Sequence, residues 1–133
     1  MNGTPAAELG GKVREIWQGV LRPEAVAAGV TEPVLSFLER RMLTSNPAGL
    51  VSMAAALLKA EDKTAELADR GLPAHVLYGE EDNAWPPAQQ RQMAARLGAE
   101  CTCIPGAAHN PNVEAPATTA LALTKFWNAA EGL

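Results

Sequence analysis

Residues 72–114 read LPAHVLYGEEDNAWPPAQQRQMAARLGAECTCIPGAAHNPNVE, and this stretch decides the fold. Apolar and β-branched side chains bounded by Gly and Pro predict strands over residues 74–78 and 100–104. Between them, the proline pair at 86–87 predicts the start of a helix and Gly98 its end. A strand, a crossover helix and a second strand favour two parallel neighbours in one sheet, joined by a right-handed crossover.

An acidic and an imidazole side chain follow the two predicted strands. Asp82 lies a few residues beyond the first strand, and His109 lies beyond the second. Loops after the carboxyl ends of parallel strands share one edge of the sheet, so we expect the two side chains to meet. Asp82 would then hold the imidazole in one tautomer, and His109 would act as a general base. The plainer alternative is that Asp82 is a turn residue and His109 a loop histidine.

The two loops resemble those of a known family. Residues 79–82 read GEED and residues 104–109 read IPGAAH, whereas α/β-hydrolases carry a G-x-x-D acid loop and then a G-x-x-H histidine loop. The segment NPNVEAP at 110–116, followed by a helix with aromatic residues near its end, is also similar to the closing segment of that family. The resemblance spans about residues 72–128.

This resemblance implies that Asp82 is the catalytic acid and His109 the triad histidine, with a serine upstream in a G-x-S-x-G turn. The sequence has no such pattern, because none of its serines, Ser36, Ser45 and Ser52, lies in that context after a strand-like run. The two cysteines lie downstream of the acid, which is the wrong order for a nucleophile. We therefore expect the chain to be inactive alone.

Helical periodicity dominates the first 71 residues. Residues 12–21 predict an amphipathic helix that is interrupted at Arg22-Pro23. Asn46 is expected to cap a further helix. Its predicted inner face consists of Leu50, Met53, Ala54, Leu57 and Leu58.

The expected fold class is α/β. The resemblance implies an incomplete α/β-hydrolase fold, in which a mainly helical cap-like segment over residues 1–62 precedes the C-terminal part of the hydrolase core over residues 63–133. The core part would hold the two-strand parallel β-α-β unit and a last helix over residues 116–130. The side chains expected to pack that helix on the sheet are Ala120, Leu123, Phe126 and Trp127.

Composition excludes several classes of function. A formal net charge of −4 with scattered basic residues argues against nucleic-acid binding. No apolar run approaches the roughly 20 residues of a membrane span. Two cysteines form no disulfide framework, which favours a cytoplasmic protein.

No metal or cofactor is expected. Cys101 and Cys103 alternate on a predicted strand, so both thiols face one side, and we interpret them as buried apolar residues. A zinc site needs about four ligands, and the further candidates are His75 and His109, with no supporting spacing. Trp85 would either line a substrate pocket beneath the cap or cover the sheet edge.

A two-stranded ribbon is marginal by itself, and an open edge recruits partners. We therefore expect a homo-oligomer or a missing N-terminal half. The predicted activity, for the complete family member, is hydrolysis of an ester, amide or C–C bond in a small apolar substrate. Two alternatives stay open: a non-catalytic small-molecule-binding or oligomerisation module derived from a hydrolase, and a piece of a longer chain.

Overall fold

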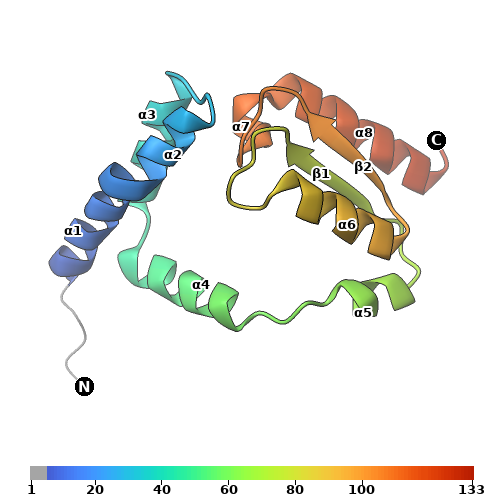
Figure 1. Cartoon of the computed structure of the whole chain (residues 1–133), viewed down its shortest axis with the longest axis horizontal. Helices are drawn as coiled ribbons and strands as arrows, with labels where there is room; N and C mark the ends of the chain where they lie inside the picture. The colour runs from blue at the N-terminus through green and yellow to red at the C-terminus, as the bar shows by residue number, and fades with distance from the viewer. Residues whose placement is uncertain (1–5) are drawn as a thin grey trace. The chain divides into compact units, whose positions relative to one another are not determined.

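The computed structural model describes residues 6–133, which form two compact units. Within that range unit 1 comprises residues 6–27 and 31–61, and unit 2 comprises residues 28–30 and 62–133. The first five residues of the expected 1–62 segment lie outside the described residues. In chain order (Figure 1) the elements are α1 (Ala6–Ile16), η1 (Trp17–Leu21), α2 (Arg22–Ala27), α3 (Val34–Thr44), α4 (Pro47–Lys59), α5 (Thr64–Asp69), β1 (His75–Gly79), α6 (Pro87–Leu97), β2 (Glu100–Ile104), α7 (Pro111–Glu114) and α8 (Pro116–Glu131).

The sheet of unit 2 has two parallel strands. His75 lies opposite Glu100, and Gly79 lies opposite Ile104. The predicted parallel pairing is therefore confirmed, although β1 begins and ends one residue later than expected. The crossover is α6, which ends at Gly98 with a left-handed φ of 64°, a conformation that glycine adopts without a steric penalty.

Two helices cover the opposite faces of this sheet (Figure 1). Val76 and Tyr78 point to one face, where they form a buried cluster with Ala94 of α6. His75 points to the other face, where its ring lies 5.5 Å from that of Phe126 in α8. Each buried large apolar side chain stabilises such a core by about 1.5–3 kcal/mol. Unit 2 is thus a small three-layer α/β/α arrangement.

Helix α8 packs on the rest of unit 2 with only part of the face that its sequence predicted. Thr119 is buried, and Leu123 and Phe126 are half-buried, whereas Ala120 and Trp127 are exposed. The expected contribution of these last two residues to packing is wrong. Each is rotated by about 100° from its inward neighbour, because a helix has 3.6 residues per turn.

The cysteines also depart from expectation. Cys101 and Cys103 are free and exposed, so the interpretation of both as buried residues is wrong. The reason is the position of β2, which pairs only with β1 among the described residues. Helix α6 lies mainly over β1, so the cysteine face of β2 receives little cover.

The described elements of unit 1 are all helices. The expected interruption at Arg22-Pro23 is wrong, because a π-helical turn, η1, joins α1 to α2. The Arg22 N–H bonds the carbonyl of Trp17, an i→i−5 bond that shifts the backbone register. Pro23 then falls in the first turn of α2, where the absence of its N–H is tolerated.

Helix α4 begins as predicted. The Asn46 side chain accepts hydrogen bonds from the N–H groups of Ala48 and Gly49. The predicted inner face is wrong, however, because Leu57 and Leu58 are 68% and 90% exposed. The buried apolar side chains of unit 1 come instead from α1, η1 and α3, namely Val13, Trp17, Leu35 and Leu38.

Candidate active site

The acid loop follows directly from β1 and is held by its own backbone. Asp82 is 8% exposed, and its Oδ1 accepts hydrogen bonds from the N–H groups of Ala84 and Trp85, both at 3.0 Å. The Nε2 of Gln90, on α6, donates to Oδ2 of Asp82 at 3.1 Å. Three N–H donors therefore fix the plane of this carboxylate before any partner approaches.

The histidine loop follows β2 and turns at Gly106, whose φ is 67°. Ala107 and Ala108 are buried, and His109 is the next residue. One carboxylate oxygen, Oε2 of Glu114, accepts hydrogen bonds from Ala108 N at 2.6 Å and from Asn110 N at 3.3 Å. Glu114 thus holds the backbone on both sides of His109.

Backbone hydrogen bonds join the two loops. The N–H of Glu80 donates to the carbonyl of Ile104 at 3.0 Å, and the N–H of Glu81 donates to that of Ala107 at 2.9 Å. The Glu80 side chain returns the contact by accepting from Gly106 N at 3.0 Å. The loops therefore continue the pairing of β1 and β2 beyond the strands.

Gly79 permits this close approach. A Cβ at this position would clash with the carbonyl oxygens of Ala107 and Ala108, which are backbone atoms that cannot swing away. A side chain here would push the histidine loop off the end of β1. The first glycine of the GEED sequence therefore has a steric role.

The two loops bring Asp82 and His109 together. His109 Nδ1 lies 3.1 Å from Asp82 Oδ1. An ionised carboxylate only accepts hydrogen bonds, so the shared proton belongs to Nδ1. The His109 side chain is 47% exposed and that of Asp82 is 6% exposed, which leaves Nε2 as the ring nitrogen available to another group. Such an imidazole is suited to act as a general base.

A sequence model of the alpha/beta hydrolase family matches residues 4–122. This chain belongs to the α/β-hydrolase family. No curated protein and no solved structure matches it.

The Asp82–His109 pair, called the dyad below, has no accompanying serine on a strand-to-helix turn among the described residues. Ser36 lies in α3 and donates to Glu32, and Ser45 follows α3 and donates to the carbonyl of Arg41. Ser52 lies within α4. These three positions are on helices or helix ends of unit 1, where no sharp turn exposes a nucleophile.

Trp85 belongs to the acid loop through its backbone. Its N–H donates to Asp82, and its carbonyl accepts from Gln90 Nε2 at 2.8 Å. The side chain is 52% exposed. Whether the indole lines a substrate pocket stays a prediction.

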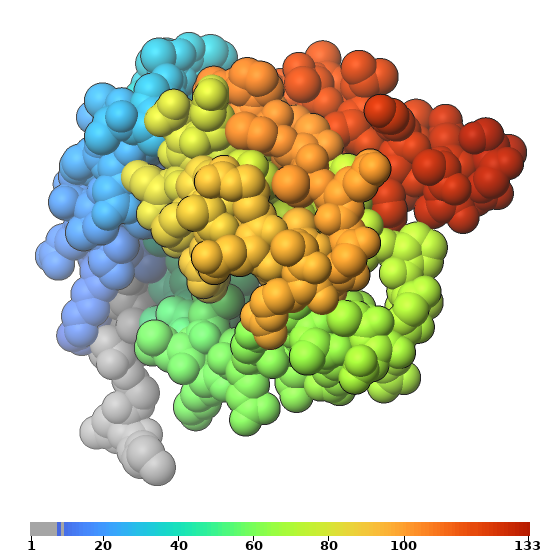
Figure 2. All heavy atoms as spheres, turned by 45° about the vertical axis from the view of Figure 1, so that its right-hand side comes forward, coloured from blue at the N-terminus to red at the C-terminus, as the bar shows by residue number. Residues whose placement is uncertain are grey.

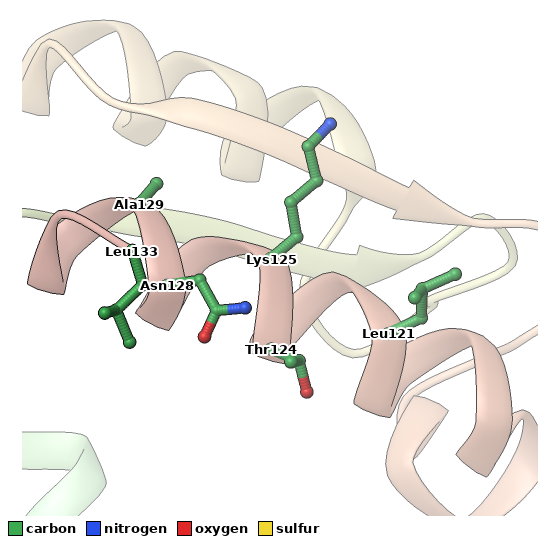
Figure 3. A pocket seen from close by; sticks show the side chains of 6 residues that line it. All are labelled: Leu121, Thr124, Lys125, Asn128, Ala129 and Leu133. Atoms are coloured by element: carbon green, nitrogen blue, oxygen red, sulfur yellow. The ribbon is translucent and has the colours of Figure 1, made fainter.

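Two concavities of unit 2 lie elsewhere. One, of about 300 Å³, is lined by side chains of α5 and its flanks, and the other, of about 530 Å³, lies along α8 (Figure 3). Neither is lined by Asp82 or His109.

Across residues 6–133 there is no group of three or more His, Cys, Asp or Glu side chains arranged to hold a metal ion. None of the helices in this range is both long and apolar enough to cross a membrane.

Three residues that hold the two loops, Glu80, Gln90 and Glu114, were not predicted from the sequence. The only available signal was their type and place: each is a polar residue within about ten positions of Asp82 or His109. Which backbone groups they bind depends on how the loops fold.

Proposed function

We propose that this chain supplies the acid and the base of a serine hydrolase, with the serine provided by other residues than these. One observation carries the proposal. In a member of the α/β-hydrolase family, His109 Nδ1 lies 3.1 Å from Asp82 Oδ1, on loops that follow two neighbouring parallel strands. Active sites of open α/β sheets form at that edge.

In the complete enzyme, His109 Nε2 would take the proton of the serine hydroxyl as the oxygen attacks an ester, amide or ketone carbon. Asp82 would keep Nδ1 protonated and stabilise the imidazolium that forms. His109 would then return the proton to the leaving group. The substrate class we propose is a small apolar molecule, with Trp85 at the edge of its pocket.

In this proposal residues 1–62 form the cap-like segment and residues 63–133 the C-terminal part of the core. The exposed apolar side chains of α4 support this assignment, because a cap-like segment would bury such side chains against another part of the complete enzyme. Alone, the chain would form a homo-oligomer, because the two-stranded sheet has open edges. It would lack hydrolase activity, because no G-x-S-x-G sequence is present.

The test is complementation in trans. The chain is mixed with the N-terminal part of an α/β-hydrolase that carries a G-x-S-x-G turn, and hydrolysis of p-nitrophenyl esters is followed. We expect activity only in the mixture, its loss in His109→Ala, and a fall of about 10⁴-fold in Asp82→Asn. His75→Gln is the matched control, because His75 lies on the α8 face of the sheet, where its ring is hydrogen-bonded to the Thr102 hydroxyl and has no part in the Asp82–His109 pair. Activity that survives His109→Ala would refute the assignment.

Nitrogen NMR of the isolated chain provides a readout that needs no partner. We expect the neutral His109 ring to carry its proton on Nδ1, and Asp82→Asn to change that tautomer. A ring protonated at Nε2 in the parent chain would contradict the proposed role of Asp82.

A second candidate function is non-catalytic binding, and the groove along α8 favours it (Figure 3). Leu121 and Leu133 line this groove and are 72% and 86% exposed. The last turns of α8, dark red in Figure 2, stand out from the rest of unit 2. Thermal shifts with a panel of apolar esters and acids, without turnover and abolished by Leu121→Ser, would support this function over the first.

A further inference from the structure

The two cysteines form a pair on the outer strand of unit 2. Cys101 lies opposite Val76 and Cys103 lies opposite Tyr78, so both thiols are on the face of the sheet that carries α6. Both are free and exposed. Orange atoms of this part of the chain lie at the surface in Figure 2. The thiols are therefore accessible together and from one side.

Strand geometry disfavours a direct bond between them. Alternate residues on a strand are separated by about twice the rise per residue, or ~6.6 Å. A disulfide requires its Cβ atoms to approach to about 3.8 Å. Joining Cys101 to Cys103 would therefore bend β2, whereas one atom placed between the two sulfurs would bridge the gap without bending the strand.

A guanidinium lies over the same face. Arg91 Nη1 donates to the hydroxyl of Tyr78 at 3.4 Å, and Tyr78 is the strand partner of Cys103. This hydrogen bond raises the pKa of Arg91 above its ordinary value. Arg91 is thus positioned to offset negative charge on the sulfurs.

We propose that Cys101 and Cys103 bind one Cu(I) ion as a two-coordinate bis-thiolate. Thiolates select soft ions, and Cu(I) is a soft ion that two thiolate ligands can satisfy. Zinc would need about four ligands, and the described residues offer no third one, since His75 lies on the opposite face.

The binding step balances without a change of oxidation state. Each thiol releases its proton to the solvent as an S–Cu bond forms, and copper stays Cu(I) throughout. Two thiolates and one Cu(I) leave a single negative charge, which the Arg91 guanidinium offsets. This site is independent of the dyad and of the proposed hydrolase function.

The test is competition for Cu(I) under anaerobic conditions. The reduced full chain is titrated against the Cu(I)–bicinchoninate complex, whose absorbance falls as copper is transferred, and native mass spectrometry counts the copper ions and the protons lost. We expect one copper per chain and two protons lost. Cys101→Ser and Cys103→Ser should each weaken binding by at least about 100-fold, because one thiolate alone leaves the second position to a weaker ligand.

Charge is tested separately with two arginines of α6. Arg91→Gln should weaken binding by about threefold, the size expected of an exposed charge pair. Arg96→Gln is the matched control, because Arg96 pairs instead with Asp62 at 2.7 Å, and it should leave the affinity unchanged. Equal effects of the two substitutions would remove Arg91 from the site.

X-ray absorption at the copper edge decides the ligand set without any variant. Two sulfur neighbours at one distance are expected. A third ligand, a nitrogen ligand or one copper shared by two chains would overturn the proposal, as would a single-cysteine variant that competes as well as the parent. Circular dichroism confirms that each serine variant is folded, which both exposed positions should permit.

Discussion

The two units of the chain bury their side chains for different purposes. In unit 2 the most completely buried residues include Ile104, Ala107 and Ala108, which lead into the histidine loop. Among the described residues of unit 1, the buried apolar side chains lie on α1, η1 and α3, and the indole N–H of Trp17 is buried without a hydrogen-bond partner. The core of unit 2 is therefore also the support of the dyad, whereas the core of unit 1 supports no comparable site among the described residues.

The comparison shows how a small unit can hold a precise pair of side chains. Three features fix the histidine loop at Ala107 and Ala108. They are the backbone pairing of the two loops beyond the strands, the Glu114 carboxylate bound to the loop backbone, and Gly79, where the two loops approach most closely. Unit 1 has strong helices but leaves α4 largely uncovered. Order in unit 2 should accordingly respond to small changes at these loop residues, whereas substitutions on the exposed face of α4 in unit 1 should have little effect.

Gly79→Ala should have the largest effect. The new Cβ meets two backbone carbonyls, and overpacking of this kind destabilises by about 3 kcal/mol. Gly106→Ala is the control, because its Cβ meets nothing within 4 Å and only its positive φ of 67° is strained, at about 1 kcal/mol. Amide hydrogen exchange of β1 and β2 measures both. Equal protection in the two variants would show that the backbone around Gly79 has room for a Cβ atom beside the carbonyls of Ala107 and Ala108.

Much of unit 2 could be predicted from sequence because its signals are local. Glycine and proline mark the ends of strands and helix, and the order of the acid and histidine loops follows from a strand-helix-strand pattern. The closeness of Asp82 and His109 then follows from parallel pairing alone. The predicted catalytic roles of these residues and of Trp85 stay predictions.

Other features depend on cover that periodicity does not encode. A helical pattern says which residues of α4 share a face, but not whether another element lies against that face. The same holds for Cys101 and Cys103: alternation places both thiols on one side of β2, while the lateral position of α6 decides their exposure. The contacts of Glu114 likewise depend on the folded loop, because its partners are backbone groups without a sequence signature.

Glu114→Gln should have the next largest effect. The neutral amide keeps the shape of the side chain and an accepting oxygen, but it loses the negative charge that strengthens two hydrogen bonds to the loop around His109, a loss of about 1.5 kcal/mol in all. Exchange should accelerate at residues 107–110, and the His109 NMR signals should broaden. Glu131→Gln, at the end of α8, is the matched control and should change neither. If the histidine loop stays as protected as in the parent chain, Glu114 does not hold it.

A smaller effect is expected at the start of α5. Hydrogen bonds from Thr64 and then Arg96 hold the pKa of Asp62 well below its ordinary value of 3.8. A depressed carboxyl pKa contributes stability that is present above pH 3.8 and is lost as the pH falls further. Asp62→Asn should lower the Tm slightly at pH 6, and the difference from the parent should shrink below pH 3.8. A difference that grows on acidification would have the wrong sign.

Leu58→Gln should have almost no effect, although it removes a leucine from an apolar helix. Leu58 is 90% exposed, and surface substitutions of this kind change stability by less than about 0.5 kcal/mol. Leu38→Ala, in the buried part of the same unit, is the contrasting variant and should destabilise by about 3 kcal/mol. Urea unfolding measured at several protein concentrations separates the two. If Leu58→Gln destabilises the chain, and more so at high concentration, then α4 is covered by a second copy, and unit 1 completes its core by association.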